Sequence, residues 1–118
     1  MYLTEAIISA DGEQYPMAGV YPVVSQMQKG LRRLGYREAI MQTSTILGES
    51  KSCCYGHEFH YSNIDTMPNE IKRAYVLDDG RAEGYLKDNT LAGYIHLHWG
   101  KTPEVAHHFV QAMLKLQD

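Results

Sequence analysis

Apolar and aromatic residues recur along this chain in short segments separated by turn residues, and the β-branched and aromatic side chains in these segments are typical of strands. If residues 53–64 are extended, His57 shares one face of the strand with Tyr55, whereas Glu58 and His60 share the opposite face. The alternation therefore predicts a strand with a polar, titratable face.

Turn-forming residues divide the rest of the chain, first at Asp11-Gly12 and later at the polar cluster 48–52. Pro16 and Pro22 predict that the segment 15–24 is an edge strand or a loop-like strand. The expected elements are a helix remnant that runs into an extended segment at 2–10, extended segments at 15–24, 34–45, 74–77 and 90–99, a loop with one helical turn at 25–33, a loop at 63–73 and a turn or hairpin at 80–89.

The C-terminal segment carries the signals of a helix. Thr102 is placed as an N-cap, Pro103 suits the first helical position, and Glu104 and Lys115 complement the two ends of the helix dipole. An apolar stripe at helical spacing is expected to pack on the sheet; it comprises Val105, Phe109, Val110, Met113 and Leu114. The predicted fold class is α/β, with a mixed β-sheet and a C-terminal packing helix.

Composition limits the range of functions. The 118 residues are 44% hydrophobic and 21% charged, which fits one domain over residues 1–118. The net charge of −3 argues against a nucleic acid partner. The sequence has no apolar run near the roughly 20 residues that span a bilayer and no secretory signal, so we expect a cytoplasmic protein without membrane contact.

Six histidines raise the question of a metal site. His57 and His60 lie three residues apart and would point to opposite faces of a strand, whereas His96 and His98 share a face and could chelate together. No helical His-Glu-x-x-His motif or cysteine pair at ligand spacing is present. We predict no metal site, and a histidine-rich metal-binding domain remains an alternative to histidines hydrogen-bonded within the sheet.

Two further groups could carry chemistry. Cys53 and Cys54 lie beside neither a histidine nor a helix start in the sequence, so we expect buried structural thiols rather than a nucleophile. Glu58, between His57 and His60, suits acid and base chemistry or, equally, a buried ion pair that joins two strands.

Several motifs occur together in an order that resembles one family. Residues 56–62 (GHEFHYS) and 91–99 (LAGYIHLHW) are similar to the C-terminal part of the cobyrinic acid a,c-diamide synthase family, and a relative that acts on nickel sirohydrochlorin shares these motifs. Further similarities are Asp11-Gly12, Tyr15-Pro16-Met17, Gly19, residues 34–39 (LGYREA) and Pro103-Glu104.

The resemblance implies the second portion of a class I glutamine amidotransferase domain. Such enzymes amidate the a and c side-chain carboxylates of cobyrinic acid, or act on a related tetrapyrrole, with ammonia from glutamine. The resemblance places ATP and magnesium in an N-terminal domain that this chain lacks, so we expect no cofactor here. Without a phosphate-binding Gly-rich loop, the sequence has no site for ATP of its own.

The resemblance also implies residue roles. His96 matches the catalytic histidine, and His98 falls where many related amidotransferases carry an orienting glutamate; Glu58, His57 and His60 are candidate supporting residues. The family's nucleophilic cysteine precedes a Met-Tyr-Leu segment with which this sequence begins, so we expect a fragment without a nucleophile that is inactive alone.

Two further expectations follow from such a fragment. A truncated relative that serves as a non-enzymatic, partner-binding module is the alternative interpretation. A fragment would also expose apolar surface and a sheet edge, so we expect self-association, with a homodimer as its simplest form.

Overall fold

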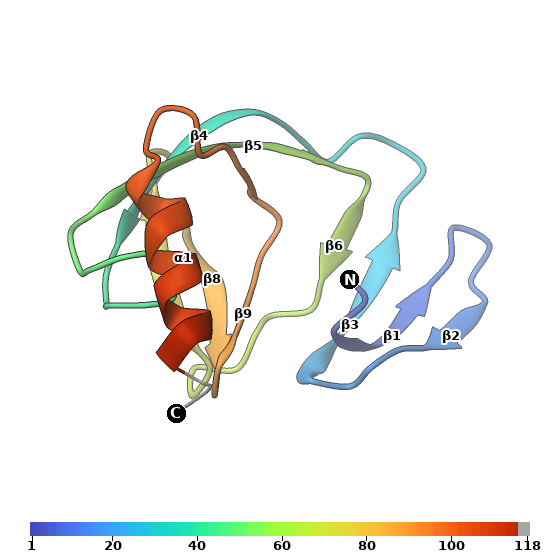
Figure 1. The fold of residues 1–118 in the computed structure, drawn as a ribbon. Helices are drawn as coiled ribbons and strands as arrows, with labels where there is room; N and C mark the ends of the chain where they lie inside the picture. Colours follow the sequence, from blue (N-terminus) through green and yellow to red (C-terminus); the bar gives the residue numbers. More distant parts are fainter. Residues whose placement is uncertain (116–118) are drawn as a thin grey trace.

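The computed structural model describes residues 1–115, which form two β-sheets and one helix (Figure 1). The strands are β1 (Thr4–Ile8), β2 (Gln14–Pro16), β3 (Tyr21–Met27), β4 (Arg33–Met41), β5 (Cys53–His60), β6 (Ser62–Ile64), β7 (Lys72–Leu77), β8 (Ala82–Lys87), β9 (Thr90–Ala92) and β10 (His96–Leu97), and the helix is α1 (Glu104–Lys115).

The smaller sheet has the strand order β2-β1-β3-β6. β1 and β3 are parallel and the other pairs are antiparallel, which gives this sheet its mixed character. Pro22 lies where the register between β1 and β3 shifts, and a proline is tolerated there because a bulge leaves the ladder unpaired.

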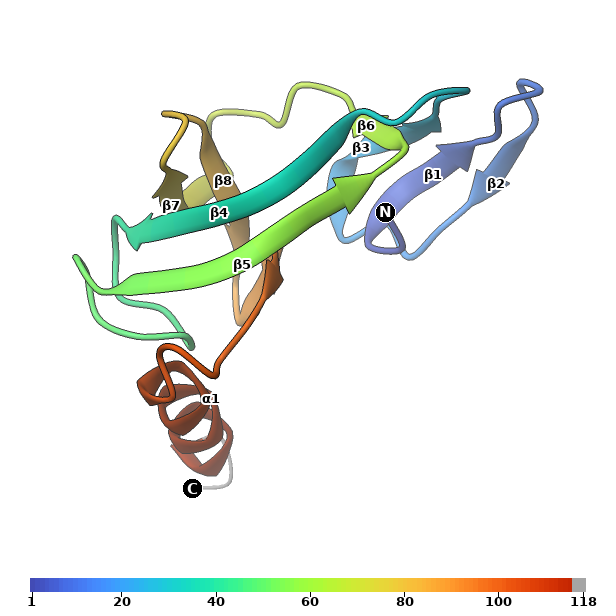
Figure 2. The same cartoon turned by 90° about the horizontal axis from the view of Figure 1, so that it is seen from above.

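The larger sheet has the order β10-β5-β4-β7-β8-β9, and all its pairs are antiparallel. Figure 2 shows β4 and β5 as a long curved pair that runs from the side of α1 towards the smaller sheet. The chain changes sheets at Tyr61, because β5 belongs to the larger sheet and β6 to the smaller one. Buried residues of β5 at positions 54, 56 and 58 alternate with less buried ones at 53, 55, 57 and 59, as the sequence pattern predicts.

Two apolar clusters hold the structure. The first lies between the larger sheet and the start of α1 and includes Met41, Cys54, Tyr75 and Val105. The second lies between the two sheets and comprises Tyr21, Val23, Met67 and Ile71, with Tyr85 of β8 packed against it. The inward face of β5 therefore contributes to the core, while its outward face remains exposed.

Several sequence-based expectations about strands are wrong. Residues 2–10 contain no helix remnant, whereas the expected extended segment is present as the strand β1, whose backbone pairs with β2 and β3. The expected loop with a helical turn at 25–33 contains the end of β3 and a loop over residues 28–32 that bends at 29–30 but forms no helical turn. The extended segment 90–99 is broken into β9 and β10.

The predicted helix is present, but it packs less than expected. Val105 is buried and Phe109 is partly buried beside Trp99, whereas Val110, Met113 and Leu114 are about half exposed, so the C-terminal part of the stripe does not pack on the sheet. The hydroxyl of Thr102 has no hydrogen-bond partner among residues 1–115, and it therefore does not cap the helix as predicted. The expected continuation to the last residue falls outside the described residues at 116–118.

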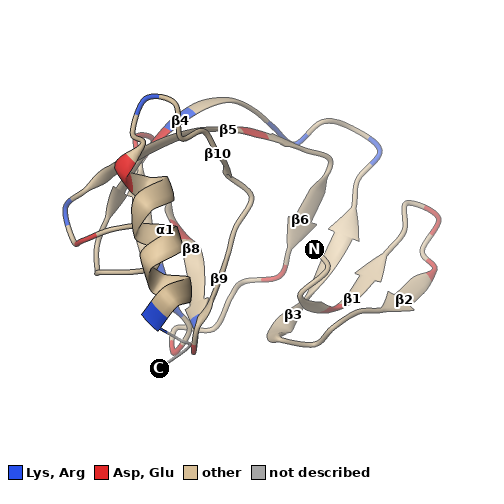
Figure 3. Cartoon of the chain, in the orientation of Figure 1, with Lys and Arg blue, Asp and Glu red and all other residues tan. Residues whose placement is uncertain are grey.

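Charged residues of both signs occur on loops of both sheets (Figure 3). Within residues 1–115, no helix has the length and apolar character needed to cross a membrane.

Candidate functional site

The central feature of the outward sheet face is a pair of histidines. His96 in β10 is directly opposite His57 in β5, in the antiparallel register. The His96 Nδ1 and His57 Nε2 atoms are 3.2 Å apart, and the two rings meet edge to face with centroids separated by 4.8 Å. Both residues are exposed. Strand pairing thus joins two motifs that lie 39 residues apart in the sequence.

A shallow pocket of about 580 Å³ adjoins this pair on the outward face of β4 and β5. Lys101 lies 3.6 Å from the centre of the Tyr55 ring, a cation–π contact that holds the segment after β10 against the sheet. The pocket is lined by Tyr36, Arg37, Glu38, Tyr55, Gly56, His57, Asp78, His98 and Lys101. It brings groups of both charge signs close to His57.

His98 lines this pocket but makes a different contact from His96. Its backbone N–H donates to the Tyr55 carbonyl at 2.7 Å, which extends the pairing of β10 with β5. Among the described residues, His96 has a side-chain hydrogen-bond contact with His57 and none with His98. The expectation that His98 orients His96 therefore has no hydrogen bond to support it.

Glu58 lies on the inward face and is fully buried. Arg81 binds it with Nη2 at 2.6 Å and Nη1 at 3.0 Å, and Arg37 Nε and His60 Nε2 each approach at 3.0 Å. Burial alone would raise the pKa of the Glu58 carboxyl, but hydrogen bonds from Arg81, His60 and Arg37 outweigh it and hold that pKa at about 2. Of the two interpretations of Glu58, the structure supports the buried ion pair.

His60 connects this cluster to the strand after it. Its Nδ1 lies 2.7 Å from the Ser62 carbonyl, and its ring stacks on Tyr94 with centroids 3.9 Å apart. The Tyr94 and Ser62 hydroxyls are 2.8 Å apart. The histidine-rich motif 57–60 is therefore divided between two faces, with His57 beside His96 and with Glu58 and His60 in a structural network.

The cysteines lie in β5 away from the histidine pair. Cys54 is buried, as predicted, and Cys53 is partly buried. Burial raises the pKa of the Cys54 thiol to about 11 and also raises that of Cys53, so neither is a ready thiolate at neutral pH. Within residues 1–115, no group of three or more His, Cys, Asp or Glu side chains is arranged to hold a metal ion.

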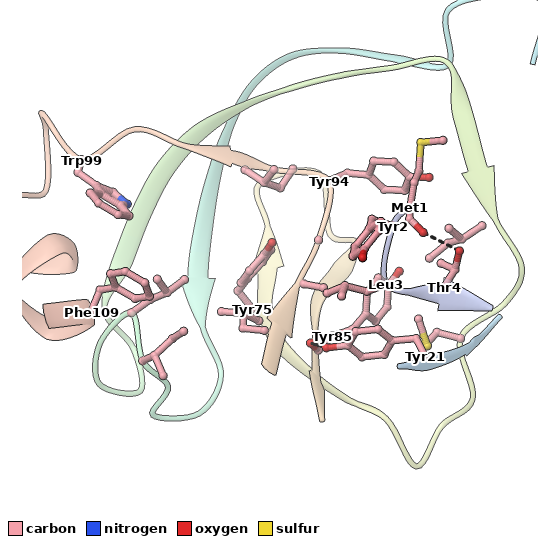
Figure 4. Close-up of a pocket in the computed structure, with 18 residues that line it drawn as sticks. Met1, Tyr2, Leu3, Thr4, Tyr21, Tyr75, Tyr85, Tyr94, Trp99 and Phe109 are labelled. Carbon is pink, nitrogen blue, oxygen red and sulfur yellow. Dashed lines mark hydrogen bonds between the residues drawn. The ribbon is translucent and has the colours of Figure 1, made fainter. Parts of the chain in front are cut away.

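A second cavity, of about 430 Å³, lies between the two sheets (Figure 4). Aromatic rings of Tyr75, Tyr85 and Tyr94 line it, and Trp99 and Phe109 lie at the side of α1. Among the residues that the structure describes, its lining is mostly apolar and includes no histidine. The cavity therefore offers shape and apolar surface rather than acid or base chemistry.

Comparison with known proteins identifies the family. The sequence profile of the CobB/CobQ-like glutamine amidotransferase domain matches residues 1–104. The chain belongs to this family. Its curated relatives include cobyrinate a,c-diamide synthases of Leptospira interrogans (40% identical, covering 98% of this chain and 27% of the relative), Dehalococcoides mccartyi (40%, 94% and 25%) and Salmonella typhimurium (34%, 95% and 26%). This chain thus spans about a quarter of the length of the curated relatives it matches.

The family membership confirms the resemblance, but the structure adds residues that sequence reasoning missed. Arg37 and Arg81 complete the cluster around buried Glu58, and the exposed Asp79 binds Arg81 at its rim, 2.8 Å from Nη2. Lys101 was also missed as a pocket residue. No spacing rule links Arg81 to Glu58, because the two residues meet only through the pairing of β5, β4 and β7 and the turn after β7.

Proposed function

We propose that this chain supplies the catalytic histidine, His96, to the glutaminase reaction of a cobyrinate a,c-diamide synthase. The observation that carries the proposal is the placement of His96. Its ring lies exposed on the sheet face with Nδ1 engaged by His57, while Nε2 has no hydrogen-bond partner among the described residues. The names of the curated relatives support the substrate assignment.

The reaction requires a thiolate, a base and an oxyanion hole. His96 Nε2 would accept the thiol proton as the sulfur attacks the glutamine carboxamide, and a C–S bond forms. It would then return that proton to the departing nitrogen as the C–N bond breaks and ammonia leaves. Water then hydrolyses the thioester to release glutamate and regenerate the thiol.

The nucleophile is assigned to another part of a longer protein, called the parent enzyme below. The thiols of Cys53 and Cys54 have raised pKa values, and among the described residues neither thiol is hydrogen-bonded to His96. We therefore expect the 118-residue chain alone to release no glutamate from glutamine.

Glutamine and cobyrinic acid, or a related tetrapyrrole, are the proposed substrates of the parent enzyme, and the proposed location is the cytoplasm. ATP and magnesium are proposed cofactors of the parent enzyme, and this sequence carries no phosphate-binding Gly-rich loop for them. Their binding is assigned to the rest of the parent. We also propose that the isolated chain self-associates through its exposed sheet face, where the Leu34 and Tyr36 side chains are 65% and 89% exposed.

Substitution of His96 in the parent enzyme tests the proposal. His96→Ala should abolish glutamine-dependent amidation and leave ammonia-dependent amidation largely intact, because added ammonia bypasses the glutaminase step. His107→Ala is the matched control, since His107 is an exposed histidine on α1. Loss of both activities, or of neither, in the His96 variant would refute the assignment.

A further inference from the structure

We propose that His57 is the positioning residue that orients His96 and selects its tautomer, a role that rests on the proposed function of His96 as the base. The geometry is a direct contact between the two rings. His96 Nδ1 lies 3.2 Å from His57 Nε2, within hydrogen-bond distance. A general base needs this kind of support, because the nitrogen opposite the reacting one sets the ring orientation and the proton position.

The direction of the hydrogen bond follows from the chemistry required. If His57 Nε2 donated, His96 would carry its own proton on Nε2 and could not accept one from a thiol. His96 must therefore donate from Nδ1 to the lone pair of His57 Nε2. His57 then carries its proton on Nδ1, and His96 Nε2 presents its lone pair outward.

The pairing of β10 with β5 fixes the relative position of the two imidazole rings. His96 and His57 occupy directly opposed positions of β10 and β5, and the next pair, Leu97 and Gly56, continues the ladder. A Cβ at residue 56 would lie 2.7 Å from Ile95 Cγ2, so glycine allows β10 to approach β5 closely. The separation of the two imidazoles is thus set by strand pairing.

Other candidates for this role are placed elsewhere. Glu58 and His60 lie on the inward face and bind each other, at 3.0 Å. His98 has its backbone in the ladder and its side chain in the adjoining pocket. Among the described residues, His57 is the side chain that His96 contacts by hydrogen bonding.

The first test uses the 118-residue chain labelled with nitrogen-15 in histidine. Long-range nitrogen–proton spectra, recorded where both imidazoles are neutral, report the tautomer of each ring. We expect His96 to be protonated on Nδ1 and free on Nε2. This population should fall in His57→Ala and return in His57→Gln, whose side-chain oxygen can accept the same hydrogen bond. A His96 ring protonated on Nε2 in the unsubstituted chain would overturn the proposal.

The second test measures glutamine-dependent amidation by the parent enzyme. His57→Ala should lower kcat about tenfold with little change in KM for glutamine, the effect of one lost hydrogen bond to the base. His57→Gln should recover most of that loss, because its side-chain oxygen can accept the hydrogen bond from His96. If His57 acted only by packing, the ability to accept a hydrogen bond would not separate the glutamine variant from the alanine variant. His107→Ala again serves as the control.

The outcomes separate the two proposals. If His96→Ala spares glutamine-dependent activity, the proposed function fails. If His96→Ala abolishes that activity while His57→Ala retains full kcat, or if His57→Gln is as impaired as His57→Ala, the positioning role of His57 fails alone. Ammonia-dependent amidation should remain unchanged in both His57 variants, and its loss would also overturn this specific role.

Discussion

Replacing the buried carboxylate Glu58 by glutamine should destabilise the fold at neutral pH and remove part of its acid sensitivity. Glu58 is fully buried and is bound by Arg81, Arg37 and His60. Glu58→Gln keeps the size of the side chain but removes the negative charge that these donors require. Its amide group would also place N–H donors near the arginine N–H groups.

The ion pairs of Glu58 set the size of the expected loss of folding stability. The pKa of Glu58 falls from an ordinary value of 4.5 to about 2 in the folded chain, a difference that corresponds to about 3 kcal/mol of stability at pH 7. Removing one partner of a buried ion pair costs about 3–5 kcal/mol. Because Arg81 also contacts Asp79 at 2.8 Å and would stay paired in the variant, we expect a loss near the lower end, about 3 kcal/mol.

The pH dependence has a definite sign. A lowered folded-state pKa means that the contribution of Glu58 is present above pH 4.5 and is lost as the pH falls towards 2. Buried Glu83 has a raised pKa, chiefly through burial, and contributes with the opposite sign. The Glu58 carboxylate also helps to raise the pKa of Glu83, so the difference between the unsubstituted chain and the variant reports Glu58 together with its coupling to Glu83.

Urea unfolding followed by circular dichroism, at neutral and at acidic pH, measures these effects. Glu70→Gln is the matched control, because Glu70 is exposed and lies outside the cluster. We expect the stability difference between the unsubstituted chain and Glu58→Gln to shrink as the pH falls through the window from 4.5 to 2. A variant as stable as the unsubstituted chain at pH 7, or a difference that is independent of pH, would refute the reasoning.

Two further predictions concern backbone space and the exposed sheet. Gly84→Ala should destabilise the chain by about 3 kcal/mol, because a Cβ would overlap the Tyr75 ring at a position where φ is +73°. Gly80→Ala is the control: its φ is +85°, but a Cβ would meet open space, so the loss should be only about 1 kcal/mol. Equal losses of stability in thermal unfolding would contradict this prediction. The isolated chain should sediment as dimers or larger species at micromolar concentration, and Leu34→Glu with Tyr36→Lys should shift it towards monomer. A strictly monomeric unsubstituted chain would contradict the proposed self-association.

The sequence alone predicted much of the local order of this chain. The period of two along residues 53–60 predicted that His57 and Glu58 face opposite ways, and the structure confirms this with one exposed and the other buried. Turn signals predicted the break at Asp11-Gly12, which lies between the antiparallel strands β1 and β2, and the helix begins at Glu104, one residue after Pro103. These features depend on neighbouring residues, which is why a linear pattern was sufficient to find them.

Long-range pairing accounts for what the sequence did not predict. The sequence predicted an extended segment within residues 2–10, but it did not predict that β1 would lie between parallel β3 and antiparallel β2, which satisfy its backbone on both sides. Likewise, no spacing indicated that His57 would meet His96 or that Arg81 would reach Glu58. The amino-acid sequence by itself determined which side chains share a strand face, whereas the tertiary structure decided which strands lie side by side and hence which side chains form the candidate site. The physical reason is that strand pairing joins distant segments through backbone hydrogen bonds that are the same for every residue type, so the partner is selected only when the whole core packs.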